Sequence, residues 1–349
     1  MRASTLNAML FTSMSKTMRR SVCLLGVLAL AACGAQDAPE AGAKPAVTAD
    51  YVLTADQTHN KFSAVIPPVI TVPSGAVIEA YTQEATGGQL ALGSTMADLE
   101  AVDSDLLIAL TGPVYVEGAE PGDTLAVTLI ELEPGDWGWT GVWPDFGLLA
   151  GEENHFDIKT YALDKETNTV EFADGIRIPL QPFAGVMGVA PATDEMLSTI
   201  PPRANGGNMD DRNIITGTTV YFPVFVDGAL FSIGDTHAVQ GMGEVGGSAV
   251  EAPMRIVYKV DVVKGGRKLP EPQYETDTYY ATTGFATTID EAARKATRFM
   301  IDHVVVTYGL SRSDAYMLCS LACDLKIAEV VDVPNMLVAM HLRKDIFEE

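Results

Sequence analysis

Residues 114–130 read VYVEGAEPGDTLAVTLI, two short runs rich in β-branched residues on either side of a Pro-Gly-Asp turn. This pattern is typical of β-strands joined by tight turns, because Pro, Gly and Asp supply the backbone angles that turns need. A similar run at 69–78 contains Pro73-Ser74-Gly75, and residues 251–262 alternate as a strand does. The sequence therefore predicts strands from about residue 51 to about residue 275.

The last quarter of the chain changes to helical signals. Thr288-Ile289-Asp290-Glu291 is a capping box, and it predicts a helix that ends at Gly309. Ser311 predicts the start of a second helix, which runs to about Ile327. The predicted fold class is therefore α+β: β-rich, with sandwich-like or barrel-like strands through about residue 275, and with C-terminal helices.

The charge balance excludes one large class of partner. The 349 residues contain 23 Lys and Arg against 46 Asp and Glu, a formal net charge of −23. Proteins that bind nucleic acid need a basic surface to neutralise phosphates, so we expect no nucleic-acid partner.

The N-terminus resembles a bacterial lipoprotein signal. Arg19 and Arg20 precede the apolar run 22–30, which is followed by Ala31, Ala32 and Cys33. We expect a signal peptide over residues 1–32, lipidation of Cys33, a flexible tether over 33–50 and the functional region over 51–349. The expected location is the cell envelope, periplasmic or otherwise extracytoplasmic, with membrane contact only through the lipid anchor. The alternative is an ordinary cleaved signal with an incidental cysteine.

The densest group of reactive side chains lies at 234–247, which reads GDTHAVQGMGEVGG. Asp235 and His237 are two residues apart, so an extended strand would place them on one face. Carboxylate and imidazole together suit zinc or a similar divalent ion. Two further polar groups lie at 205–211, which contains Asp210, and at His59-Asn60. Spacing alone leaves open the simpler interpretation that 234–247 is only a glycine-rich loop.

Other segments carry two interpretations each. Cys319 and Cys323 lie four apart in the second predicted helix, either as two soft metal ligands or, more simply, as small buried apolar residues. The aromatic, turn-rich segment 137–144 either lines a pocket or caps the end of a barrel. His303 and His341 lie in apolar segments and are expected in the core or at the surface.

Taken in order, these clusters resemble the acetamidase/formamidase family, over nearly all of residues 55–345. The resembling segments are His59-Asn60-Lys61, Val72–Gly75, Thr111–Asp123, Trp137-Gly138-Trp139, Phe183–Pro191, Gly206–Asp210, Asp235–Glu251 and Ala315–Ser320. The resemblance implies hydrolysis of short aliphatic amides to a carboxylate and ammonia, and a β-rich α+β fold. It also implies a homodimer or larger homo-oligomer, and a zinc or calcium ion near Asp210, Asp235 and His237. Met242 and Gly246 depart from the family pattern, which has a polar residue and a cysteine at these places.

The resulting hypothesis is metal-dependent hydrolysis of the C–N bond of formamide-like or acetamide-like substrates by metal-activated water. Asp210, Asp235 and His237 are the expected metal ligands, with His59 as a further candidate. Glu244 is the expected proton carrier and Glu251 the reserve. Two alternatives remain: an inactive tethered protein that binds an amide or another solute, and a hydrolase of a larger periplasmic amide.

Overall fold

The computed structural model describes residues 47–153, 155–266 and 268–348. The predicted signal peptide, Cys33 and most of the predicted tether lie outside these residues. Within them, no helix is both long and apolar enough to cross a membrane.

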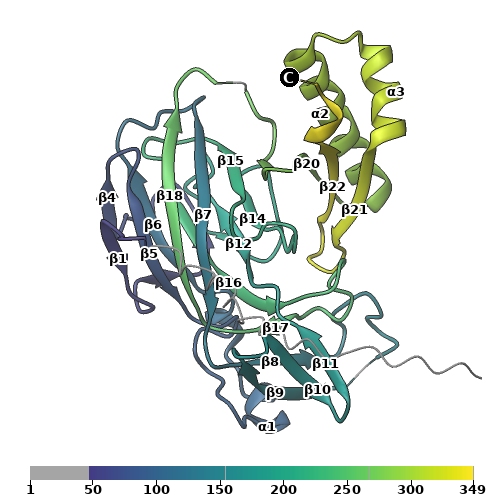
Figure 1. The fold of residues 1–349 in the computed structure, drawn as a ribbon. Coiled ribbons are helices and arrows are strands. Elements are labelled where there is room, and N and C mark those ends of the chain that lie inside the picture. The colour runs from purple at the N-terminus through teal and green to yellow at the C-terminus, as the bar shows by residue number, and fades with distance from the viewer. Residues whose placement is uncertain (1–46, 154, 267, 349) are drawn as a thin grey trace, which may run out of the picture. The chain divides into compact units, whose positions relative to one another are not determined.

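Two large sheets make up most of the fold (Figure 1). The first has nine strands in the order β1 (Tyr51–Leu53), β5 (Val77–Thr82), β18 (Met254–Val263), β7 (Thr124–Pro134), β15 (Thr219–Pro223), β19 (Gln273–Glu275), β20 (Tyr279–Ala286), β22 (Met336–Arg343) and β21 (Cys323–Glu329). All neighbours in it are antiparallel except β1 and β5. The order is open, so the described strands form no closed barrel, and the β-rich α+β prediction is confirmed.

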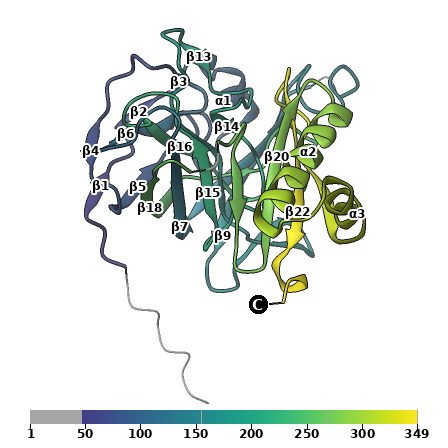
Figure 2. The ribbon, with the colours of Figure 1, turned by 90° about the horizontal axis from the view of Figure 1, so that it is seen from above.

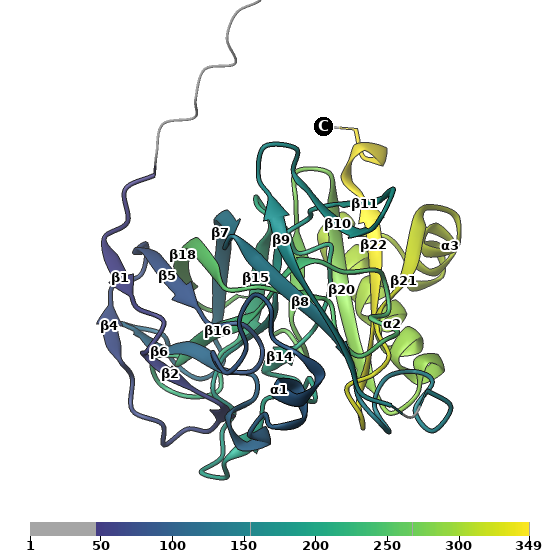
Figure 3. The same ribbon diagram turned by 90° about the horizontal axis from the view of Figure 1, so that it is seen from below.

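The second sheet has eleven strands. Its main path is β11 (Ile176–Pro179), β10 (Thr169–Ala173), β9 (Asp157–Asp164), β8 (Trp137–Val142), β17 (Val250–Glu251), β16 (Phe231–Val239), β12 (Phe183–Gly188) and β14 (Gly206–Asn208). β6 (Leu110–Val116) also pairs with β16, and β2 (Thr58–His59) and β4 (Ile70–Val72) pair with β6. β8, β9, β10 and β11 lie side by side at one end of this sheet (Figure 3). A two-stranded sheet of β3 (Lys61–Phe62) and β13 (Leu197–Ser198) completes the strands.

The two large sheets share an apolar core. Phe231 of β16 meets Tyr258 of β18 with ring centroids 5.5 Å apart, and both side chains are fully buried. The same core takes Ile78 and Val127 from the first sheet and Met187 from the second. Burial of apolar surface, at about 25 cal/mol per Å², is the main term that holds the sheets together.

The helices lie mainly at the C-terminal end of the sequence. α2 (Ile289–Tyr308) packs against β20 and β22, and α3 (Arg312–Ala322) lies beside α2 and contacts β21 and β22 (Figures 1 and 2). The Thr288 hydroxyl accepts from the backbone N–H of Glu291 at 3.3 Å, and Gly309 ends α2 in the left-handed conformation, as predicted. The remaining helical segments are α1 (Met96–Glu100) and two 3₁₀ turns, η1 (Ser104–Leu106) and η2 (Lys344–Ile346).

Two sequence predictions are wrong in this region. The second helix ends at Ala322, not near Ile327, because residues 323–329 form β21 and pair with β22. Strands also continue well past residue 275, to Arg343. In residues 323–329, pairing with the next strand, β22, outweighs the local helical preference.

β16 changes the face that its side chains occupy. Phe231 and Ile233 point into the core, as does Thr236, whose hydroxyl lies 2.8 Å from that of Thr82 on the facing sheet. Two odd-numbered residues and one even-numbered residue cannot share a face of a regular strand. The change occurs at Asp235, whose φ of 48° is left-handed. It turns Asp235 and His237 away from the core.

Candidate active site

Three strands of the second sheet place a histidine, a glutamate and a tryptophan in one row. His237 of β16 is the register partner of Glu251 on β17, and Glu251 is the register partner of Trp139 on β8. Directly opposed residues of antiparallel strands share a face. The sheet register therefore brings an imidazole, a carboxylate and a large aromatic ring together.

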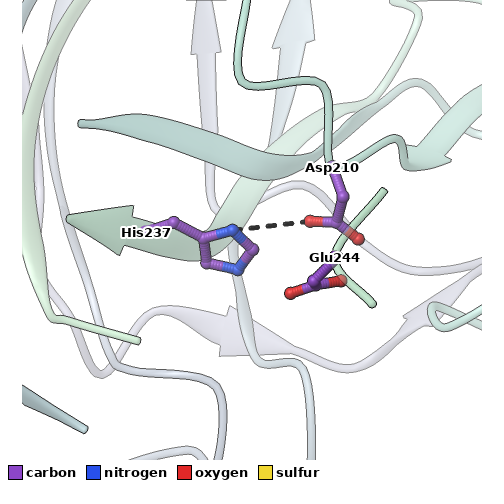
Figure 4. Close-up of side chains that lie close together, drawn as sticks. All are labelled: Asp210, His237 and Glu244. Carbon is purple, nitrogen blue, oxygen red and sulfur yellow. Dashed lines mark ion pairs between the residues drawn. The ribbon is translucent and has the colours of Figure 1, made fainter. Parts of the chain in front are cut away.

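The His237 ring lies among buried carboxylates. Its Nε2 is 3.1 Å from Glu251 Oε2 and 3.7 Å from Asp235 Oδ2, and its Nδ1 is 3.6 Å from Asp210 Oδ1. Figure 4 shows Asp210 and Glu244 beside the ring. Two groups, Asp210–His237–Glu244 and Asp235–His237–Glu251, each have ligand atoms close enough together to hold one metal ion.

Three of these carboxylates stand on unusual backbone. Asp210, Asp235 and Glu244 have φ values of 40°, 48° and 45°. This left-handed region is unfavourable for residues with a Cβ, and it persists where the surrounding structure enforces it. Three acids that lie close together in space share this conformation. The bent backbone therefore directs their carboxylates toward His237.

Gly185 of β12 makes room for this arrangement. A Cβ at this position would lie 2.3 Å from Asp210 Oδ1 and 2.9 Å from His237 Cε1. Such contacts are far inside van der Waals distance, so a side chain here would displace the acid or the ring. The Asp210 carboxylate therefore packs directly onto glycine backbone.

Gln240 fixes the protonation of the His237 ring. The Gln240 amide nitrogen donates to the Asp210 backbone oxygen at 2.8 Å, which leaves its Oε1 facing His237 Nδ1, also at 2.8 Å. Because Oε1 only accepts, Nδ1 carries the proton. Nε2 is then the position that a second proton or a metal ion can take, and it makes no hydrogen bond with the described residues. A second group that orients a histidine in this way is the usual companion of a metal-ligating imidazole.

The unpartnered atoms of the site fit a cation. Both Asp210 oxygens, Asp235 Oδ1 and Glu251 Oε2 are buried without a hydrogen-bond donor. Among the described residues, no Lys or Arg forms an ion pair with any of the four carboxylates around His237. Buried charges need a partner, and one imidazole cannot balance four acids. Each of the two groups offers two carboxylates and one imidazole nitrogen, a donor set that suits zinc or a similar divalent ion.

The electrostatics follow from burial and from the crowding of like charges. Burial, with Asp235 nearby, raises the pKa of Asp210 to about 7. Burial and the neighbouring Asp210 hold the pKa of Glu244 well above its ordinary value. Burial lowers the pKa of His237, but Glu251 and Asp235 outweigh it and keep that pKa well above 6.5. The field that favours a proton here also favours a metal ion.

The loop that carries Glu244 is tied to the C-terminal strands. The Gly243 backbone N–H donates to the Ala328 carbonyl at 2.8 Å. This contact brings Glu329 and Asp332 close to the site, and Asp332 accepts from the Asn208 amide at 2.8 Å. Burial raises the pKa of Glu329 to about 8 and that of Asp332 well above its usual range. Glu329 and Asp332, which follow α3 in the chain, therefore add two carboxyl groups to the surroundings of the site.

His59 lies outside both groups. Its Nδ1 is 2.6 Å from the Lys61 carbonyl and its Nε2 is 2.8 Å from the Ser232 hydroxyl. Ser232 precedes the change of face in β16, so this contact lies on a different part of the strand from His237. With both nitrogens engaged, the ring holds β2 against β16.

A cavity of 380 Å³ opens onto the acids. Its polar lining includes Asp210, Asp235, Glu244 and Glu251, and its apolar lining includes Trp139 and Trp143. Of the two interpretations of segment 137–144, lining a pocket is therefore the one that the structure supports. Glu244 is the most exposed of the four acids, at 7%.

The sequence profile of the Acetamidase/Formamidase family matches residues 47–198 and 192–349. The chain belongs to the acetamidase/formamidase family. This confirms the family predicted from the sequence and, with it, the enzyme class of an amidohydrolase.

Relatives of known name cover most of the chain. It is 26% identical over 374 residues to a formamidase of Methylophilus methylotrophus, covering 84% of this chain and 90% of the relative. It is 28% identical over 269 residues to an acetamidase of Mycolicibacterium smegmatis, covering 60% and 66%. The crystal structure of an acetamidase from Bacillus halodurans superposes with a TM-score of 0.80 and 33% identity, covering 85% of this chain and 98% of that one.

Within this family member, sequence reasoning missed several residues of the site. Gln240 lies three residues after His237, inside the segment already singled out, and that spacing was the available signal. Gly185 lies in the segment 183–191 that carries the resemblance, but only the fold shows what its missing side chain allows. Glu329 and Asp332 gave no signal.

The remaining positions that the sequence singled out do not line the cavity. Met242 does not line it, and its sulfur is 3.6 Å from the Asn213 amide instead. A Cβ at Gly246 would meet nothing within 4 Å. Cys319 is buried between α2, α3 and β22, and no group of potential ligands among the described residues includes either cysteine.

Proposed function

We propose that this family member hydrolyses the C–N bond of short linear amides, such as formamide and acetamide, with the help of a bound divalent cation. The relatives named formamidase and acetamidase support the substrate class. The observation that carries the metal is the buried Nε2 of His237, which has no hydrogen-bond partner among the described residues and faces carboxylate oxygens while Gln240 holds Nδ1.

The proposed ligands are Asp210, Asp235, His237 and Glu251, which come from the two groups that share His237. Glu251 replaces His59 in the set expected from the sequence, because its Oε2 lies 3.1 Å from His237 Nε2. Its other oxygen accepts from the Ala249 backbone N–H at 2.8 Å, which fixes the carboxylate in place. Zinc and calcium remain the two candidate ions, and a nitrogen donor among the ligands favours zinc.

In the proposed chemistry the ion activates the amide carbonyl and the water, and Glu244 moves the proton. A divalent cation held by these residues would polarise the amide carbonyl and would lower the pKa of water toward about 7. Glu244 faces the cavity and takes a proton from the attacking water on a carboxylate oxygen. It then delivers this proton to the leaving nitrogen, so that ammonia rather than amide anion departs. The raised pKa of Glu244 suits a group that must hold a proton between the two steps.

Two matched substitutions test these roles. In Glu244→Gln we expect ammonia release from acetamide to fall by about 100 to 10,000-fold while metal content stays at the wild-type level. In Glu251→Gln we expect loss of both, because a ligand is gone. Metal analysis of the purified variants, beside an ammonia assay, separates the two. Full metal content in Glu251→Gln, or normal turnover in Glu244→Gln, would contradict the assignment.

We also propose that the protein is exported and anchored through lipid on Cys33. The support is the sequence 19–33 described above. Mass spectrometry of the mature N-terminus should find a lipid-modified Cys33 as residue one, and Cys33→Ala should release the protein from the membrane fraction. An unmodified N-terminus upstream of Cys33 would contradict the proposal.

A homo-oligomer is the proposed assembly. Supporting it, exposed apolar side chains border one shallow depression of 820 Å³, among them Leu148, Met242 and Val245. Light scattering of the purified protein should give a mass of two chains or more, and a monomer would contradict the proposal.

A further inference from the structure

One side of the active-site cavity is a wall of aromatic and aliphatic side chains. Trp139 and Trp143 meet edge to face with centroids 5.6 Å apart, and Trp143 meets Phe146 in the same way at 6.4 Å. Ile108 and Ile200 line the same cavity. Trp139 is the register partner of Glu251, so this wall begins one strand away from the proposed metal ligands.

The rings of this wall are held by backbone packing. A Cβ at Gly141 would lie 3.3 Å from Trp143 Cη2, and a Cβ at Gly247 would lie 2.5 Å from Phe146 Cδ1. Both rings thus rest on glycine. The Trp139 indole N–H donates to Glu84 Oε2 at 2.7 Å, so the polar edge of that ring is satisfied inside the protein. Trp143 and Phe146 are partly exposed, so their apolar faces are available to a ligand, whereas Trp139 is 1% exposed and supports them from behind.

The cavity is too large for a one- or two-carbon amide. Its 380 Å³ equals the liquid volume of about a dozen waters and falls in the range of pockets that bury ligands of drug size. Acetamide has four non-hydrogen atoms, of which the carbonyl and the nitrogen belong at the acids. It would leave the apolar wall in contact with water.

We propose that this wall is an acyl pocket, and that the chain prefers primary amides whose acyl group carries an apolar unit about as large as a phenyl ring. The proposal rests on the proposed function, since it places the amide at His237 and Glu244. The ring of such a substrate contacts Trp143 and Phe146, and its burial adds binding that formamide and acetamide lack. The chemistry at the C–N bond is unchanged: water adds, and a carboxylate and ammonia leave.

The test compares acetamide with 2-phenylacetamide, because the two carbonyls are electronically similar and differ mainly in the apolar group. With metal-loaded protein we expect kcat/KM to be at least about 10-fold higher for 2-phenylacetamide, the lower end of what added apolar groups contribute in a fitted pocket. A ratio at or below one would overturn the proposal. If acetamide is hydrolysed and this ratio is low, the acyl pocket fails while the proposed function stands.

A filling substitution locates the effect. Ile200→Trp should narrow the pocket and lower the ratio at least about 10-fold. Met196→Trp adds the same bulk at a side chain that is 58% exposed and outside the cavity, and it should leave the ratio unchanged. Should Ile200→Trp fail to fold, as judged by its melting temperature, Phe146→Ala removes part of the wall and should lower the ratio mainly through KM. An unchanged ratio in the folded variant would also overturn the proposal.

Binding separates the acyl pocket from the chemistry. Calorimetric titration of the metal-loaded wild-type protein at low temperature, or of Glu244→Gln, should give a dissociation constant at least about 10-fold lower for 2-phenylacetamide than for acetamide. If neither amide is hydrolysed, the proposed function fails, and this titration alone decides the pocket. Equal or weaker binding of 2-phenylacetamide would then overturn it.

Discussion

Asp210 and Asp211 are adjacent in the chain and equally buried, each 1% exposed, but they face opposite environments. Both Asp210 oxygens lack a donor. Asp211 accepts from the Tyr274 hydroxyl and from both the backbone and the side chain of Asn213. The Tyr274 hydroxyl in turn lies 2.7 Å from His341 Nε2.

The two histidine–aspartate clusters differ in whether their polar atoms are satisfied. Around His341 each group has a partner within the protein, which is what a structural polar cluster requires. Around His237 the partners are missing, and the backbone is bent at three of the acids. Unsatisfied buried groups cost stability, so their presence in a well-packed chain indicates a site that a ligand completes.

The largest effect is expected from a double comparison of Asp210→Asn and Asp211→Asn. Asp210→Asn should lower amide hydrolysis by more than about 100-fold, with little loss of stability. Substitution of a residue that only supports a metal ligand already costs up to about 100-fold, and loss of a ligand should cost more. Asp211→Asn should do the reverse: a loss of about 1–3 kcal/mol in unfolding free energy with activity nearly retained. Urea denaturation and an ammonia assay on both variants check this. Equal effects on activity would remove the distinction between the clusters.

A second comparison tests how tightly the active cluster is packed. Gly185→Ala places a Cβ 2.3 Å from Asp210 Oδ1, whereas Gly241→Ala meets nothing within 4 Å and needs no left-handed backbone. We expect Gly185→Ala to lower metal affinity and activity at least about 10-fold, because even small misplacement of a reacting group is costly. Gly241→Ala should behave as wild type. Unchanged metal affinity in Gly185→Ala would mean that Asp210 is not a ligand in the position seen here.

Much of this site follows from local rules, and part of it does not. The pairing of Asp235 with His237 could be predicted because side chains two apart share a face of a strand. The structure brings the pair together, but on a strand that is bent at Asp235 itself. The role of Glu251 depends on register with β16, which no local pattern of residues specifies. The same holds for Gly185, whose missing side chain matters only because Asp210 packs against it.

The fold shows the same limit. Thr288 and Gly309 mark the ends of α2 because capping is local. Residues 323–329 become β21 only because β22 lies beside them, so their helical pattern misled the prediction. His59 was a candidate ligand by its polar neighbourhood, and only the tertiary structure shows that Lys61 and Ser232 engage its ring.

Acid should lower the stability of the fold through His341 between about pH 6.5 and pH 4. Burial lowers the pKa of His341 from 6.5 to about 4. Above about pH 6.5 the folded and unfolded chains are both neutral at this group, so its contribution is complete. As the pH falls from 6.5 to 4, the unfolded chain takes up a proton that the folded chain refuses, and stability falls, by the order of 3 kcal/mol at most.

Substitution of the histidine checks this sign. His341→Asn should make the unfolding free energy less dependent on pH between 6.5 and 4, measured by urea denaturation at several pH values. His155→Asn is the matched control, because its side chain is 54% exposed. His59, whose pKa burial also lowers to about 4, keeps part of the dependence in both variants. A pH dependence in His341→Asn as steep as that of the wild type would contradict this account.

The smallest expected effect is on the unfolding free energy, when the hydroxyl group of either of two buried tyrosines is removed. Tyr274→Phe leaves Asp211 and His341 without their shared partner, and we expect a loss of about 1–3 kcal/mol in unfolding free energy. The Tyr258 hydroxyl has no hydrogen-bond partner among the described residues, although its ring is fully buried in the core between the sheets. Tyr258→Phe removes an unsatisfied group without changing the ring, so it should be neutral or stabilising by up to about 1 kcal/mol. Urea denaturation at pH 7.5 compares the two, and a larger loss in Tyr258→Phe than in Tyr274→Phe would show that satisfied hydrogen bonds do not set the stability of these buried groups.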